Sequence, residues 1–204
     1  FYSLITKKKI NFISQKGKKL FYDRINKVGD PSLKRENFYL FDKSIRNYSK
    51  KDICKLYGWD ERKKILGIYA HTFLDGNYVL GWRTFNDNFD WLDSTLRVAS
   101  NLKKFNFLAK PHPMDKFYQK SKFNTSDLIS NYAKKHDNIK FFPEDISINS
   151  CLKIMDVGIT SHGTLSLECM SYGKPCITAG RTSWGDIILK EKPISKKKYF
   201  YNLE

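Results

Sequence analysis

The four residues Ser161-His162-Gly163-Thr164 have the composition of an anion-binding turn. They follow an apolar run at residues 157–160 and precede a helical pattern that begins at Leu165. Glycine allows close backbone approach to a ligand, and hydroxyls and amides at a helix start are donors suited to phosphate. Ser161 or Thr164 could equally cap the helix, and a capped turn can still present its amides. We therefore expect this turn to contact an anionic group.

Glu168 lies four residues beyond Thr164, on the same side of the predicted helix one turn on. Its neighbours Leu167 and Cys169 make an unusual setting for a carboxylate unless it faces a cleft. In a cleft, its two oxygens could accept hydrogen bonds from both hydroxyls of a ribose. The alternative is a surface glutamate on an amphipathic helix, and the pattern favours neither.

His112 stands between Pro111 and Pro113, directly after an apolar run. The two prolines disfavour helix and stiffen the backbone, so the imidazole is expected to be held in a fixed position. A histidine presented in this way can donate to a phosphate or act as an acid or base. Lys110 adds positive charge beside it.

The loop that begins at His71 carries the candidates for a catalytic base. Asp75 could accept the proton of a hydroxyl acceptor, with His71 as an alternative base or ligand contact. Asp75-Gly76 is also an ordinary turn-forming dipeptide, so Asp75 could simply shape the loop.

Alternating strand and helix patterns are expected to position these residues. Apolar runs predict five strands, at residues 65–69, 107–109, 139–142, 157–160 and 176–178. Helical patterns lie around residues 49–58, 91–101, 128–132, 148–155 and 165–173. This order predicts an α/β fold, a Rossmann-like parallel sheet with helices on both faces. Ligands of such sheets bind at the carboxyl ends of the strands, where the three polar segments 71–77, 110–113 and 161–164 are expected.

The chain is expected to contain two parts of unequal length. Residues 1–60 form a basic N-terminal segment of mixed structure, irregular apart from the helix near its end. Residues 61–204 are expected to form the Rossmann-like domain. The chain begins with Phe1 and not with Met, which favours a piece of a longer protein. The N-terminal segment could then be a linker from an acceptor domain outside this chain.

The composition limits the possible partners. A net charge of +16 over 204 residues favours anions: nucleic acid, an acidic membrane face or phosphate-bearing substrates. The runs of lysine in the sequence are also typical of a solvent-exposed surface that binds no partner. The four cysteines are irregularly spaced, which argues against a zinc site and a disulfide framework and favours the cytoplasm. No apolar run approaches the ~18 residues of a spanning helix.

Several familiar motifs are missing from the sequence. It contains no GxGxxG, P-loop, HExxH or Asp-x-Asp pattern. Sugar transfer that depends on a metal held by an Asp-x-Asp motif is therefore unsupported, and we expect no metal site. The aromatic pattern of RNA-recognition domains is also absent.

The segments 110–113 (KPHP) and 159–177 (ITSHGTLSLECMSYGKPCI) together resemble bacterial capsule and surface-polysaccharide glycosyltransferases of the GT-B architecture. The resemblance is to capsule-synthesis proteins that use CMP-activated sugars such as CMP-Kdo. The loop 70–78 (AHTFLDGNY) is similar to their acceptor-side loop, and the matching region covers about residues 49–186.

The resemblance implies a metal-independent transferase, of which this chain is the donor-binding half. His112 would then contact the donor phosphate, while Ser161, His162, Gly163 and Thr164 would line the nucleotide pocket beside Lys110. Glu168 would hold the ribose. The nucleotide-sugar is a substrate, so no cofactor is expected. The catalytic base stays open, because in this architecture it often comes from the other half.

Two other function classes remain as alternatives. One is transfer of a polyol phosphate from a CDP-linked donor, as in teichoic-acid polymerases, which resemble this sequence in the same motifs. The other is a non-catalytic, basic nucleic-acid-binding domain. For the glycosyltransferase we expect a cytoplasmic protein, peripheral at the inner membrane face, with a glycan or lipid-linked acceptor.

Overall fold

The computed structural model describes residues 16, 19, 46–74, 84–112, 115, 123–182 and 194–204. The chain divides into two units, Phe1–Ile45 and Arg46–Glu204, and the strands and helices below belong to the second. This unit begins ahead of the predicted division at residue 60, so it includes the first helix described below.

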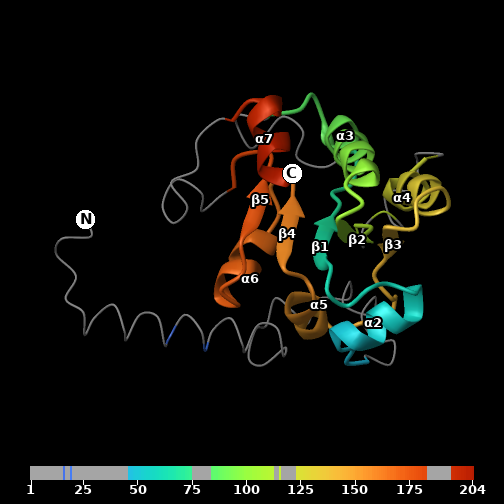
Figure 1. Cartoon of the computed structure of the whole chain (residues 1–204). Helices are drawn as coiled ribbons and strands as arrows, with labels where there is room; N and C mark the ends of the chain where they lie inside the picture. Colours follow the sequence, from blue (N-terminus) through green and yellow to red (C-terminus); the bar gives the residue numbers. More distant parts are fainter. Residues whose placement is uncertain are drawn as a thin grey trace. The chain divides into compact units, whose positions relative to one another are not determined.

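Five parallel strands form one sheet: β1 (Lys64–Tyr69), β2 (Phe105–Lys110), β3 (Ile139–Phe141), β4 (Val157–Thr160) and β5 (Cys176–Thr178). Their order across the sheet is β3-β2-β1-β4-β5 (Figure 1). The predicted α/β class with a parallel sheet is confirmed. Each of the five predicted strands is present, with bounds that differ by three residues or fewer.

Six helices are described beside the sheet (Figure 1): α2 (Lys50–Tyr57), α3 (Asn88–Asn101), α4 (Thr125–Ala133), α5 (Ile148–Ile154), α6 (Leu165–Ser171) and α7 (Lys196–Leu203). The first five correspond to predicted helical patterns. Helix α7 was not predicted, because its first three residues are lysines and suggest only a solvated run.

The sheet is buried on both faces. Leu66 and Ile68 of β1 belong to a core cluster that also contains residues of α3, α4 and α7. Ile65 belongs to a second cluster, with Ile53 of α2 and Cys151 of α5. Since successive side chains of a strand point to opposite faces, α3, α4 and α7 cover one face and α2 and α5 the other. Burial on both faces explains the near-continuous apolar run of β1.

Helix α6 packs closely against β4 at a glycine. A Cβ atom on Gly158 would lie 2.5 Å from the Sγ atom of Cys169. Ile159, the next residue of β4, belongs to the cluster with α3, so Gly158 faces the side of the sheet that carries α2 and α5. The contact brings the start of α6, and the turn before it, to the carboxyl end of β4.

Helix α2 has the ends that its sequence predicts. The Ser49 hydroxyl accepts a hydrogen bond from the Asp52 amide, and the Asp52 carboxylate accepts one from the Ser49 amide. Gly58 ends the helix with a φ of 67°, a conformation that favours glycine. Among the described residues, no helix is long and apolar enough to cross a membrane.

Candidate functional site

The strand order creates a switch point between β1 and β4. The two strands are neighbours, with Tyr69 paired to Thr160. The chain leaves β1 toward α3 on one face of the sheet, and it leaves β4 toward α6 on the other. Connections that diverge in this way open a crevice at the carboxyl ends of the two strands, where α/β proteins bind their ligands.

Three histidines from separate strands meet at this edge. His71 follows β1, His112 follows β2 and His162 follows β4. The ring centroids of His71 and His162 are 4.1 Å apart, and those of His71 and His112 are 5.8 Å apart. Both pairs are stacked, with interplanar angles of 25° and 26°. Three polar segments predicted only to share an edge are therefore in contact around His71.

Thr160, the last residue of β4, contacts two of these segments, at His71 and at Gly163. Its side chain is fully buried, and its Oγ1 atom lies 3.2 Å from Nε2 of His71. The same oxygen accepts from the Gly163 amide at 3.3 Å and donates to the Tyr69 carbonyl at 3.4 Å. Thr160 was not among the predicted site residues, because in the sequence it is only the last residue of an apolar run.

Gly163 is placed where no side chain would fit. A Cβ atom on it would lie 2.8 Å from Nε2 of His71 and 2.9 Å from Oγ1 of Thr160. The close approach predicted at Gly163 was to a ligand and stays a prediction; in the structure Gly163 lies close to His71.

The rest of the turn is held by its own contacts. Ser161 is buried, its Oγ lies 3.1 Å from Nδ1 of His162, and its carbonyl accepts from the amides of Ala179 and Gly180. The Gly163 carbonyl accepts from the hydroxyl of Ser166 at 3.3 Å. The backbone between β4 and α6 is consequently fixed before any ligand arrives.

Thr164 occupies the N-cap position of α6 but makes no side-chain cap bond. Its Oγ1 donates instead to Oε1 of Glu168, at 3.3 Å. Helix α6 has only seven residues, so its dipole adds little to anion binding, and the side chains and loop must supply most of it. Thr164 thus contacts the carboxylate that was predicted to hold a ribose.

Glu168 and Lys110 both affect the buried thiol of Cys151. Burial raises the pKa of the Cys151 thiol; Lys110 opposes this rise and Glu168 adds to it. Burial also raises the pKa of Tyr69, with a smaller contribution from Glu168. Both charges thus lie near enough to Cys151 of α5 to affect its thiol.

The backbone of His112 is anchored to the start of α4. Its amide donates to Oγ1 of Thr125 at 3.3 Å, and its carbonyl accepts from the Asp115 amide at 3.1 Å. The Asp115 carboxylate in turn accepts from the hydroxyl and the amide of Thr125. These hydrogen bonds hold the backbone of His112, and the stacking contact with His71 holds its ring.

His71 is neutral at pH 7. Burial, followed by the nearby His162 and His112, lowers its pKa from 6.5 to about 3. A group with so low a pKa is a weak base, which disfavours His71 as the base that activates an acceptor. The other candidate, Asp75, lies outside the described residues. Within the described part of the chain, no group of three histidine, cysteine or acidic side chains could hold a metal ion.

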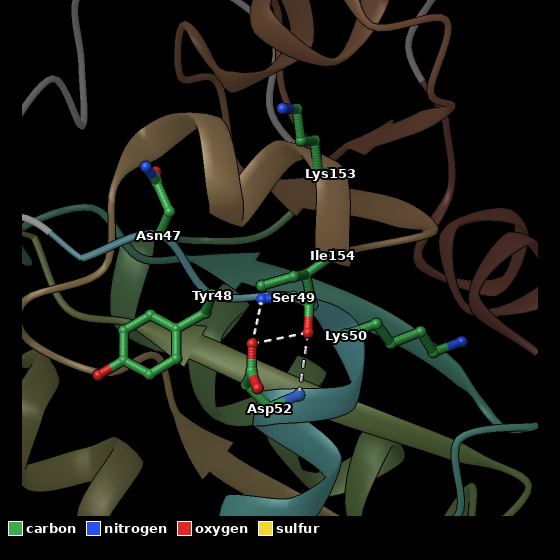
Figure 2. Close-up of a pocket in the computed structure, with 7 residues that line it drawn as sticks. All are labelled: Asn47, Tyr48, Ser49, Lys50, Asp52, Lys153 and Ile154. Carbon is green, nitrogen blue, oxygen red and sulfur yellow. Dashed lines mark hydrogen bonds between the residues drawn. The ribbon is translucent and has the colours of Figure 1, made fainter.

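A hollow of about 470 Å³ lies elsewhere, lined by Asn47, Tyr48, Ser49, Lys50, Asp52, Lys153 and Ile154 (Figure 2). Lys50 pairs with Asp156 at 3.7 Å, and Asp156 directly precedes β4. The hollow is therefore at the amino edge of the sheet, opposite the histidines. Figure 2 shows Ser49 and Asp52 hydrogen-bonded to each other, as the cap of α2.

No protein-family model matches this sequence, and no curated protein matches it significantly.

Proposed function

We propose that this chain binds a nucleotide at the carboxyl edge between β1 and β4, as the donor-binding half of a metal-independent glycosyltransferase. The donor is a nucleotide-sugar, of which a CMP-linked sugar fits the motif resemblance. The observation that carries the proposal is the convergence of His71, His112 and the turn 161–164 at the switch point of the sheet.

The roles follow from the chemistry of each group. His112, on its anchored loop, donates to the phosphate that leaves with the nucleotide, and Lys110 neutralises charge beside it. Glu168, oriented by Thr164, accepts from the ribose hydroxyls. Ser161, His162, Gly163 and Thr164 form the wall of the nucleotide pocket.

In the transfer itself, an acceptor hydroxyl oxygen bonds to the anomeric carbon as the bond from that carbon to the phosphate oxygen breaks. The electron pair leaves with the nucleotide phosphate. The proton of the acceptor passes to a base, for which Asp75 or a residue of an acceptor domain is the better candidate because His71 is a weak base.

A thermal-shift panel of CMP, CDP, UDP and GDP at fixed salt tests the proposal. A ligand that binds the folded state raises the apparent melting temperature by mass action, so CMP should give the largest rise. A rise with none of the four nucleotides would contradict a nucleotide site. A preference for CDP, with transfer of a polyol phosphate, would favour the teichoic-acid type of reaction.

Substitutions of His112 and Glu168 test whether CMP binds at the proposed site. In calorimetry, His112→Ala and Glu168→Ala should each weaken CMP binding by about tenfold or more, since each removes a charged or charge-assisted contact. His136→Ala is the matched control. His136 stacks on Tyr132 at the far end of α4, next to the start of β3, and its loss should leave CMP binding unchanged. Tight RNA binding that ignores His112, without CMP binding, would favour a nucleic-acid-binding domain.

A further inference from the structure

The central histidine of the stack has one ring nitrogen tied to a buried hydroxyl that must satisfy three groups. Oγ1 of Thr160 lies 3.3 Å from the Gly163 amide, 3.4 Å from the Tyr69 carbonyl and 3.2 Å from Nε2 of His71. A hydroxyl offers one proton and two acceptor positions. The Gly163 amide can only donate, and the Tyr69 carbonyl can only accept.

All three contacts form together in one arrangement only. The hydroxyl donates to Tyr69 and accepts from both Gly163 and His71, so Nε2 of His71 carries the ring proton. In the other tautomer the hydroxyl proton goes to Nε2, and the contact with Tyr69 is lost. Thr160 is 0% exposed, and a hydrogen bond lost in a buried position is not replaced by water.

We propose that Thr160 is a positioning residue that holds His71 in the Nε2–H tautomer and leaves Nδ1 as a hydrogen-bond acceptor. His71 then recognises a ligand group that donates a hydrogen bond, such as a hydroxyl of the sugar or of the acceptor. It does not donate to the phosphate, which is left to His112. This assignment of the ligand group rests on the proposed nucleotide-sugar site, whereas the tautomer does not.

Two observations support a fixed neutral ring. Burial, with two other histidines nearby, keeps the pKa of His71 far below its ordinary value, so the ring carries a single proton near pH 7. Nε2 also lies 2.8 Å from where a Cβ on Gly163 would be, so the turn leaves the ring little room to move away from Thr160.

The test is long-range ¹H–¹⁵N NMR of the histidine rings in the ligand-free chain. The chain has four histidines, so single substitutions assign each pair of nitrogens. In the wild type at pH 7, Nε2 of His71 should be protonated and Nδ1 not. Thr160→Val removes the hydroxyl with little change of shape, and the Nε2–H preference should fall by about tenfold. Thr160→Ser keeps the hydroxyl and should restore it.

Two results would overturn the proposal. One is an Nδ1–H tautomer of His71 in the wild type, and the other is an Nε2–H preference of His71 that is unchanged in Thr160→Val. Affinity for CMP-Kdo, which carries the sugar hydroxyls that CMP lacks, should fall by about tenfold in Thr160→Val and recover in Thr160→Ser. If the wild type binds no nucleotide while the tautomers behave as stated, the proposed function fails and the positioning role of Thr160 stands.

Discussion

At the scale of single residues, the chemistry of this edge depends on which histidine can carry charge. His71 is stacked between His112 and His162, and its lowered pKa keeps the middle of the stack neutral. Positive charge for a phosphate must therefore come from groups around it, such as Lys110. A site with a neutral centre can hold a sugar hydroxyl and a phosphate side by side.

The lowered pKa of His71 predicts a loss of stability in weak acid. Above pH 6.5 the ring is neutral in both the folded and the unfolded chain, so it contributes nothing. Below pH 6.5 only the unfolded chain binds the proton, until the folded pKa of about 3 is reached. The free energy of unfolding should fall by about 1.4 kcal/mol per pH unit, or about 2 kcal/mol between pH 6.5 and 5.

Urea denaturation at several pH values measures this slope. His71→Phe keeps an aromatic ring but cannot titrate, so its stability should be nearly flat in the same range. The control His136→Ala should keep the wild-type slope. A slope equally steep in His71→Phe would mean that other groups cause the acid sensitivity.

At the scale of elements, α7 is joined to α3 by a buried hydrogen-bond cluster. The hydroxyl of Tyr199 accepts from Nε1 of Trp91 at 2.9 Å and lies 3.0 Å from Oγ1 of Thr95. Both Tyr199 and Trp91 are fully buried. The helix that the sequence did not predict thus covers one face of the sheet, and its Tyr199 also contacts Phe85, which lies just before α3.

Removing this hydroxyl should destabilise the fold. In Tyr199→Phe the indole N–H of Trp91 loses its partner inside the core, at a cost of about 1–3 kcal/mol in the free energy of unfolding. Tyr201→Phe is the control: its side chain is 70% exposed, and the change should stay within about 0.5 kcal/mol. Equal midpoints of urea unfolding for the two variants would contradict a stabilising role for the cluster.

At the scale of the whole molecule, the excess of 37 basic over 21 acidic residues should govern association with anionic surfaces. Each Lys or Arg near an acidic membrane contributes about 1 kcal/mol to the binding free energy. In 0.1 M salt, the attraction is largely screened at distances beyond about 10 Å. A lipid-linked acceptor would be met at such a surface.

Sedimentation with lipid vesicles checks this expectation. The chain should bind vesicles that contain phosphatidylserine at 50 mM NaCl, release them at 500 mM, and ignore vesicles of phosphatidylcholine alone. Binding to the uncharged vesicles, or binding that resists salt, would contradict an electrostatic attachment. CMP binding measured at both salt concentrations separates the nucleotide site from this surface effect.

The sequence was sufficient to predict the order of elements from α2 to β5, but not α7 and not which strands are neighbours in the sheet. The apolar run that became β1 and the Ser49 cap of α2 have local causes, so both were predictable. The stack of His71 on His162 depends on β4 lying beside β1, a non-local choice that the alternation of elements does not specify. Thr160 was missed for the same reason, since its partners become visible only once the strands are paired.

The pairing of β1 with β4 can form only late in the synthesis of the chain. Thr160 and Tyr69, joined by a hydrogen bond, are 91 residues apart. At about 5–20 residues per second, a ribosome needs roughly 5–20 s to extend the nascent chain from one to the other. During that interval β1 has no β4 partner, and its open side is an unpaired strand edge. The delay is a period in which a chaperone can bind the emerging chain, and Thr160 cannot contact His71 until it ends.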